Sequence, residues 1–271
     1  MKFIKLLGLL CLICFTFIYT EKIIDVSINQ DEIMIKLKEI ENAYKIEPID
    51  AKIIDDTIIP GNVGKYIDIN TSYKEMKKIG YFEETLISYK DIYPNISIYN
   101  NYNKYIIKGN NQNKQVSLIY ILNNDKTLNH ILNVLKTKNT TISFFIDSTF
   151  LNNNIEIIYT LKDYQIYNYG NNGKYTKDNI IITNNIINNK SNNNSMYCLF
   201  TNKDINSLNT CAESKMLSIM PSITGSYKNI KNSLENGSII NITNTQELVY
   251  IIEHIKNKGY DIVPLQDIIK E

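Results

Sequence analysis

The sequence predicts an α/β protein in which a parallel sheet is covered by helices. Two observations carry this prediction. After about residue 112, short runs of consecutive apolar residues alternate with segments whose apolar residues recur at helical spacing. Continuous apolar runs are typical of parallel strands, because both faces of such strands are buried, and the helices are the usual crossovers between them. The chain has 271 residues and is 44% apolar, which is enough for a sizeable core.

The N-terminal residues have the pattern of an export signal. Lys2 and Lys5 precede an apolar run at residues 6–19, and a short basic segment before such a run directs export. No small-residue cleavage motif follows, so the sequence favours an uncleaved signal anchor over a cleaved signal peptide, in either case within residues 1–22. A lipoprotein is a further alternative. The remainder is expected outside the cytoplasmic membrane, to which the N-terminal segment anchors it.

Residues 23–111 are expected to form a small α+β extension. Apolar residues at helical spacing predict a helix over residues 31–44. A second, short helix is predicted where Ser72 and Glu75 form a capping-box pattern, and Gly80 is expected to end it. The rest of the extension is predicted to be short extended segments broken by proline and glycine.

Residues 112–271 are expected to form the main domain. Strands are predicted at residues 116–122, 142–146, 164–167, 197–200, 217–221 and 237–243. Helices are predicted at residues 128–135, 155–161, 208–216 and 244–255, and the segments 260–265 and 265–269 end the chain. The asparagine-rich stretch at residues 168–195 is expected to be either a mobile loop or a poorly formed helix around residues 180–187.

Charge and histidine content exclude two classes of site. The chain has 29 basic and 28 acidic side chains, so it lacks the broad basic field that nucleic acids require, and nucleic acid is not an expected partner. It has two histidines, His130 and His254, which argues against a metal site built on several imidazoles. Both lie in predicted helices and are expected at helix flanks rather than as ligands.

Two cysteines, Cys198 and Cys211, lie in the part of the chain that is expected to be exported. They are interpreted as two buried thiols. A disulfide between them is the alternative in an oxidising compartment.

Five segments occur in an order that resembles a known family. They are VSLIY at residues 116–120, TISFFI at 141–146, YQIYNY at 164–169, GSIINIT at 237–243 and KGYDIVPL at 258–265. Together they resemble the polysaccharide deacetylases (the NodB homology family, similar to carbohydrate esterase family 4). The segments EPIDAK at 47–52, IPG at 59–61 and YKEM at 73–76 resemble a sporulation-associated branch of that family.

The resemblance implies a fold and a chemistry. The fold is a distorted, incomplete (β/α) barrel. The family's reaction removes acetyl groups from N-acetylated glycan with a divalent metal such as zinc, which one Asp and two His usually hold. A second Asp acts as the base and a late His as the acid.

The family's chemical positions do not carry these side chains here. The Asp-Asp pair falls on Ile121 and Leu122, or on Asn123 and Asn124 if the strand shifts, and neither pair offers a carboxylate. The late histidine falls on Thr243, which is a poor acid near neutral pH. The family's Arg-Pro-Pro-Tyr-Gly motif is replaced by CLFTN at residues 198–202.

The two metal histidines of the family fall on Tyr169 and Gly173. Glycine has no ligating atom, and a neutral tyrosine is a poor ligand for such a metal. The resemblance therefore implies a degenerate active site, and no metal cofactor is expected.

The sequence thus favours an extracytoplasmic, catalytically inactive homologue that binds peptidoglycan or another N-acetylated glycan. The residues expected to line its groove are Asn123, Asn124, Asn168, Tyr169 and Asn244. Tyrosine rings that could stack on sugars, with ordinary packing as the alternative, are Tyr120, Tyr164, Tyr167 and Tyr169.

Two other functions stay open. One is a residual metal-dependent deacetylase, whose site would have to be rebuilt from carboxylates: Asp125, Asp147, Asp163 and Asp204. The other is a structural or interaction protein of a spore or envelope assembly.

Overall fold

The computed structural model describes residues 14–16, 20, 22–23, 26–110, 112–191 and 195–271. Most of the predicted export segment at residues 6–19 lies outside the described residues. Within the described part, no helix combines the length and the apolar character that crossing a membrane requires.

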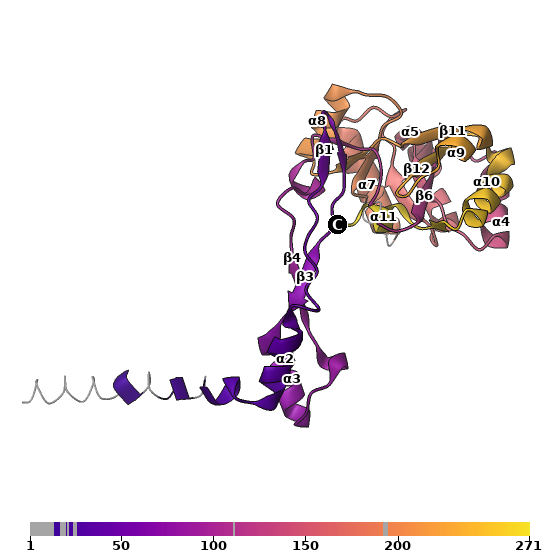
Figure 1. Ribbon diagram of the computed structural model, residues 1–271. Coiled ribbons are helices and arrows are strands. Elements are labelled where there is room, and N and C mark those ends of the chain that lie inside the picture. The colour runs from indigo at the N-terminus through magenta and orange to yellow at the C-terminus, as the bar shows by residue number, and fades with distance from the viewer. Residues whose placement is uncertain (1–13, 17–19, 21, 24–25, 111, 192–194) are drawn as a thin grey trace, which may run out of the picture. The chain divides into compact units, whose positions relative to one another are not determined.

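The contacts divide the chain into two compact units (Figure 1). One comprises residues 1–48 and 63–93, and the other comprises residues 49–62 and 94–271. The sequence-based boundary assigns all of residues 23–111 to the extension. The structure assigns two parts of that range to the larger unit, because β1 (Lys52–Ile54), β2 (Thr57–Ile59) and β5 (Tyr105–Ile106) join its sheet.

The smaller unit pairs two helices with a two-stranded sheet. The elements are α2 (Glu32–Glu41), β3 (Gly64–Ile67), α3 (Ile69–Ile79), η1 (Glu84–Leu86) and β4 (Tyr89–Ile92). Strands β3 and β4 are antiparallel. The buried side chains of Leu37, Ile67 and Met76 form its core.

The start of α3 differs from the prediction. Its N-cap is Asp68, whose carboxylate accepts a hydrogen bond from the Thr71 N–H at 3.2 Å. Ser72, the predicted cap, is wholly buried inside the helix, where its hydroxyl accepts a bond from the Ser88 N–H at 2.9 Å. The end of the helix is as predicted, with Gly80 at a φ of +84°. The adjacent Lys90 ammonium lowers the pKa of Asp68 to about 2.

A mostly parallel sheet forms the larger unit. Its remaining strands are β6 (Gln115–Leu122), β7 (Ser143–Ile146), β8 (Gln165–Asn168), β9 (Tyr197–Leu199), β10 (Leu217–Ile219), β11 (Ile223–Gly225), β12 (Ile239–Ile242) and β13 (Asp261–Ile262). The strand order is β1-β2-β5-β10-β9-β8-β7-β6-β12-β11, with β13 beside β6. The two ends of this order do not pair with each other, so the predicted distorted, incomplete barrel is confirmed.

Helices pack on the sheet, most of them on its outside. They are α4 (Leu128–Thr137), α5 (Ser148–Asn153), α6 (Ile157–Thr160), α7 (Lys177–Lys190), α8 (Ile205–Glu213), α9 (Tyr227–Ser233), α10 (Leu248–Asn257) and α11 (Leu265–Ile269), with 3₁₀ turns η2 (Ile98–Asn100) and η3 (Thr245–Glu247). Helices α4 and α10 lie side by side (Figure 1), where Lys138 pairs with Glu253 at 2.6 Å.

Helix α7 resolves the open question about the asparagine-rich stretch. It is a regular helix of 14 residues, and Thr176 and Asn179 form a reciprocal capping box at its start. Its buried face consists of Ile180, Thr183 and Ile187. Burial of this face orders a segment whose other residues are mostly polar.

Alternate residues of each strand supply two separate cores. Leu118, Phe144 and Ile166 point outward and pack beneath the helices. Ile119 and Phe145, with partners from the other strands and from α11, fill the inside of the barrel. The inside is therefore packed with side chains, as the period of two along a strand requires.

A third cluster surrounds a disulfide. Cys198 of β9 and Cys211 of α8 are bonded to each other, with their Cα atoms 6.5 Å apart. Both side chains are wholly buried, together with Phe200 and Leu208. The interpretation of Cys198 and Cys211 as two free thiols is therefore wrong. Their positions on facing elements bring the sulfur atoms within bonding reach.

Candidate functional site

The carboxyl ends of β6, β7 and β8 lie level with one another. Leu122 is paired with Ile146, and Ile146 is paired with Asn168. The residues that follow these strands therefore gather at one edge of the barrel, which is where open α/β sheets bind ligands. This edge carries the positions that the family resemblance singles out.

Asp147 is the carboxylate that the structure brings to this edge. It follows β7 directly, and its side chain is 4% exposed. One carboxylate oxygen accepts bonds from the Thr149 and Phe150 N–H groups at 2.9 and 3.1 Å, and the other accepts from the Asn172 N–H at 2.7 Å. Asp147 thus caps α5 and holds the neighbouring turn, and backbone N–H groups take up three of the about four acceptor positions of its carboxylate.

That turn spans residues 171–174 and reverses the chain in two residues. Asn171 and Lys174 exchange backbone hydrogen bonds, each 3.0 Å long. Between them, Asn172 has a φ of +49° and Gly173 a φ of +76°. Positive φ at both central residues is the pattern of a type I′ turn, for which Asn-Gly is the preferred pair.

The structure brings the family's two histidine positions together. Tyr169 is 9% exposed, and its backbone carbonyl accepts a bond from the Gly173 N–H at 3.2 Å. A Cβ built on Gly173 would lie 3.1 Å from the Tyr169 hydroxyl oxygen. The tyrosine ring therefore occupies the space into which a side chain at position 173 would extend.

The remaining family positions offer no metal ligand either. Leu122 is wholly buried in the outer core, and Ile121 is half-buried against the inner core. Thr243, beyond the end of β12, is exposed. Just before it, the side-chain oxygen of Asn241 is buried without a hydrogen-bond partner among the described residues.

The candidate carboxylates do not form a cluster. Asp125 and Asp163 are exposed, and Asp204 caps α8, where the Ser207 hydroxyl and N–H lower the pKa of its carboxyl. In the part of the chain that the structure describes, no group of three or more His, Cys, Asp or Glu side chains could hold a metal ion. The donor set at the barrel edge does not fit the family's divalent metal.

Both histidines lie in helices at the outside of the sheet. His130 of α4 is exposed, and its ring nitrogen Nε2 is 3.2 Å from the Thr245 carbonyl oxygen. His254 of α10 is half-buried, with its ring edge-on to Tyr227 at 5.5 Å between centroids.

A polar cleft, here called the edge cleft, opens beside Asp147. Its volume is about 570 Å³. It is lined by Asn123, Asn124, Asp147, Thr149, Phe150, Asn153, Asn154, Asn171 and Asn172. Asn123 and Asn124, predicted for the groove, are thus exposed in this cleft.

The other predicted groove residues do not line the edge cleft. Asn168 is wholly buried and bonds within the protein: its oxygen accepts from the Gly170 N–H at 2.6 Å, and its amide donates to Asn184 at 2.9 Å. Tyr169 is buried beside the turn, and Asn244 caps η3. Buried polar groups must find internal partners, which explains why Asn168 is not free for a ligand.

The tyrosines that could stack on sugars pack instead. Tyr120 and Tyr164 both lie edge-on to Phe144, at 6.3 and 5.6 Å between centroids. Tyr167 is 2% exposed and lies edge-on to Tyr197 at 4.8 Å. Burial raises the pKa of both Tyr167 and Tyr197 far above the ordinary value. These rings contribute to the cores, which was the alternative interpretation.

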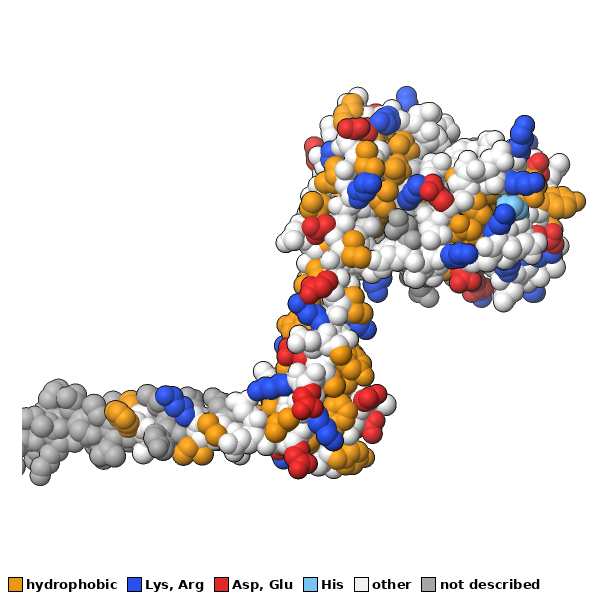
Figure 2. Space-filling view, in the orientation of Figure 1, with side chains coloured by type: hydrophobic (Ala, Val, Ile, Leu, Met, Phe, Trp, Pro, Cys, Tyr) orange, Lys and Arg blue, Asp and Glu red, His pale blue; other side chains and the backbone are white. Residues whose placement is uncertain are grey.

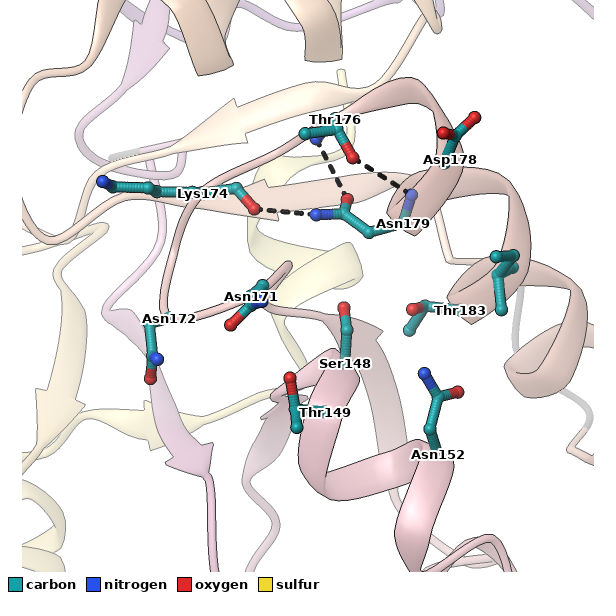
Figure 3. Close-up of a pocket in the computed structure, with 11 residues that line it drawn as sticks. Ser148, Thr149, Asn152, Asn171, Asn172, Lys174, Thr176, Asp178, Asn179 and Thr183 are labelled. Atoms are coloured by element: carbon teal, nitrogen blue, oxygen red, sulfur yellow. Dashed lines mark hydrogen bonds between the residues drawn. The ribbon is translucent and has the colours of Figure 1, made fainter.

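A second cleft, here called the helix cleft, lies between α5 and α7 (Figure 3). Its volume is about 590 Å³, and it shares Thr149, Asn171 and Asn172 with the edge cleft. The helix cleft could not be predicted from the sequence. No helix is predicted at the position of α5, and a helix at the position of α7 is one of two alternatives. Amides and hydroxyls line both clefts, and most of the lining surface of the helix cleft is apolar. The edge is therefore suited to an uncharged ligand that has both hydrogen-bonding groups and apolar faces.

Comparisons with known proteins agree with the fold. No family model matches the sequence. The uncharacterized protein YlxY of Bacillus subtilis (strain 168) is 27% identical over 138 residues, which are 49% of this chain and 43% of that protein. The match therefore spans less than half of that relative.

Solved structures are also similar, and two of them illustrate the likeness. BA3943 of Bacillus anthracis, a carbohydrate esterase family 4 pseudoenzyme, superposes with a TM-score of 0.64 at 20% identity over 89% of this chain and 96% of that chain. The Bc1960 peptidoglycan N-acetylglucosamine deacetylase superposes with a TM-score of 0.53 at 20% identity, over 62% and 95%. The chain has the fold of the family 4 polysaccharide deacetylases, and the resemblance seen in its sequence is confirmed at that level.

Proposed function

We propose that this chain is an exported, catalytically inactive protein with the deacetylase fold that binds peptidoglycan or another N-acetylated glycan. The observation that carries the proposed inactivity is the turn at residues 171–174. A histidine at position 173 would need an unfavourable backbone conformation, since φ is +76° there, and its Cβ would crowd the Tyr169 hydroxyl.

Glycan binding is supported by the edge cleft. Exposed amides of Asn123 and Asn124 meet amides from the loop after α5 and from the turn. Amides donate and accept hydrogen bonds at once, as sugar hydroxyls and acetamide groups require. The fold neighbours include a peptidoglycan deacetylase, which makes this polymer the first glycan to test.

The distribution of charged side chains on the surface favours an uncharged ligand over nucleic acid. Lys, Asp and Glu side chains are interspersed on the face of the larger unit that Figure 2 shows, without a field of one sign. The chain as a whole has a formal net charge of +1. A polyanion would find no basic surface on this face.

Location outside the cytoplasm is supported by two features. The basic and apolar N-terminal pattern is that of an export signal or anchor. The Cys198–Cys211 disulfide is typical of proteins that fold in oxidising compartments.

The test of function is sedimentation with purified peptidoglycan, combined with an assay for released acetate. We expect the full chain to sediment with the polymer and to release no acetate from N-acetylglucosamine oligomers, with or without added zinc. The Asn123→Ala/Asn124→Ala variant should bind several-fold more weakly, because it removes two amides from the edge cleft.

The matched control is Asn206→Ala/Asn209→Ala, which removes two exposed amides from α8, outside both clefts. It should sediment like the unaltered chain. Acetate release that depends on zinc would refute the inactivity, and failure of the unaltered chain to sediment would refute glycan binding.

A further inference from the structure

The helix cleft has its own walls, separate from the edge cleft. It lies between α5 and the first two turns of α7 (Figure 3), and Ser148, Asn152 and Thr183 line it without lining the edge cleft. The two clefts share residues at their border, so one extended ligand could occupy both.

The centre of the helix cleft carries no charge. The side chains of Lys174 and Asp178 belong to the cleft wall but point away from its centre (Figure 3). The groups that point inward are hydroxyls and amides. An ionic ligand would find no opposite charge there, whereas a ligand with hydroxyl and amide groups would find matching partners.

Thr183 provides the second, independent observation. Its side chain is wholly buried on the inner face of α7, and its hydroxyl has no hydrogen-bond partner in the described part of the chain. The hydroxyl points across the cleft toward Ser148 (Figure 3). A buried hydroxyl without a partner destabilises the fold, and at the wall of a cleft a ligand can complete its bonding.

Two further groups in the cleft have spare bonding capacity. The only hydrogen bond of the Ser148 hydroxyl within the described residues is a long one, 3.4 Å to the Asn168 side-chain oxygen. The Asn152 amide is exposed and makes no side-chain hydrogen bond within the described residues. At the rim, Ile182 is 52% exposed, and it can contact the aliphatic face of a sugar ring or the methyl group of an acetamide.

We propose that the helix cleft is a second glycan subsite that takes one uncharged pyranose ring, with the Thr183 hydroxyl bonded to that ring. The identity of the polymer rests on the proposed function, but the site does not. The inference assigns ligand contacts to Ser148, Asn152 and Thr183, none of which lies at a position that the family's reaction uses.

The test is Thr183→Val, which removes the hydroxyl and keeps the shape of the side chain. We expect the dissociation constant for a chitin-type N-acetylglucosamine oligomer, measured by titration calorimetry on the full chain, to rise at least fivefold. The melting temperature should rise by about 2–4 °C, because the variant no longer buries an unsatisfied hydroxyl. Weaker binding by a more stable protein is a result that general damage cannot produce.

The matched control is Ser218→Ala in β10. Ser218 is also wholly buried with an unpartnered hydroxyl among the described residues, and it does not line the helix cleft. This variant should melt at a higher temperature and bind the oligomer unchanged. Asn152→Ala, at the exposed rim, should weaken binding without changing the melting temperature.

The outcomes separate the two proposals. If Thr183→Val and Asn152→Ala bind like the unaltered chain while Asn123→Ala/Asn124→Ala binds weakly, the subsite is refuted and the proposed function stands. If the unaltered chain binds no glycan, both fail. Equal affinity of the helix cleft for the cationic glucosamine oligomer would refute its preference for an uncharged ring.

Discussion

At the scale of single residues, the turn at residues 171–174 bears on the predicted loss of the metal site. Tyr169 and Gly173 are neighbours in space, as expected if they correspond to two metal-binding histidines of the family. Asn172 and Gly173 both have positive φ, which β-branched and bulky residues avoid. Restoring a metal site would therefore need a different backbone path here as well as new side chains.

The turn could be predicted from the sequence, whereas the burial of the neighbouring Asn168 could not. The Asn-Gly pair at residues 172–173 is a strong signal for a two-residue turn, and it could have predicted the turn without any structure. The burial of Asn168 could not be predicted, because it depends on Asn184 and on Tyr175. The Tyr175 hydroxyl donates to the Asn168 carbonyl at 3.0 Å, and complete burial raises the pKa of Tyr175 well above its ordinary value.

A residue-scale prediction concerns His254. Its Nε2 is buried without a partner in the described part of the chain. Burial first, then the charges of Lys258 and Lys231, lower its pKa from the ordinary 6.5. The unfolded chain therefore takes up this proton at a higher pH than the folded chain does. We expect the free energy of unfolding to be insensitive to this group above about pH 6.5 and to fall as the pH drops from there toward the folded pKa.

The measurement is urea unfolding at a series of pH values for the unaltered chain, His254→Phe and His130→Gln. His254→Phe should lose the decrease below about pH 6.5. His130→Gln, which alters an exposed ring, should retain it. The same decrease in all three variants would show that another group is responsible.

At the scale of elements, the strands of the main domain follow from short apolar runs, because a strand buried on both faces needs apolar residues at consecutive positions. For α7 the sequence left a loop and a helix as alternatives, and for β11 and α9 it predicted no element. In α7 the capping residue at the third position is Asn179 rather than Glu or Gln, so the usual sequence signal was absent. Its order comes from three buried side chains that contact the sheet.

The disulfide between β9 and α8 yields an element-scale prediction. Cys198 and Cys211 are separated by 13 residues, and removing a crosslink of that span costs about 2–3 kcal/mol of unfolding free energy. We expect Cys198→Ala/Cys211→Ala to lose this amount in guanidinium unfolding. Cys14→Ala, which alters an exposed free cysteine, should lose none.

Alkylation of the full chain from producing cells tests the compartment. Both sulfurs are wholly buried, so the cells are lysed directly into denaturant that contains the alkylating reagent. Cys198 and Cys211 should then react only after reduction, because the bonded sulfurs are not nucleophilic. Labelling of both without a reductant would contradict the export that we propose.

At the scale of the whole larger unit, segments distant in sequence complete one sheet. Strands β2 and β5 continue the sheet from β10, although the sequence places them far before the apolar strands of the main domain. A second link is Glu271, whose carboxylate accepts from the Gly61 and Ile98 N–H groups at 3.1 Å each and from the Ser97 hydroxyl. This carboxylate connects three segments of the larger unit.

We therefore expect Glu271→Ala to lower the free energy of unfolding by about 1–3 kcal/mol, the range for hydrogen bonds to a charged group. Amide hydrogen exchange at Ile98 and Gly61 should become faster. Lys270→Ala, an exposed neighbour, is the control and should change neither quantity. Unchanged exchange at both amides in Glu271→Ala would show that the carboxylate does not hold these segments.

The sequence by itself determined the fold class and the order of the main strands, and it predicts the loss of the family's chemical side chains. These depend on local patterns: apolar runs, helical spacing and residue identity at fixed positions. Only the tertiary structure decided which polar side chains are free for a ligand, that two cysteines are bonded, and that residues 49–62 and 94–110 belong to the larger unit. Whether an amide is buried in a network, as in Asn168, or exposed in a cleft, as in Asn123, depends on partners far away in the chain, and residue type alone does not specify them.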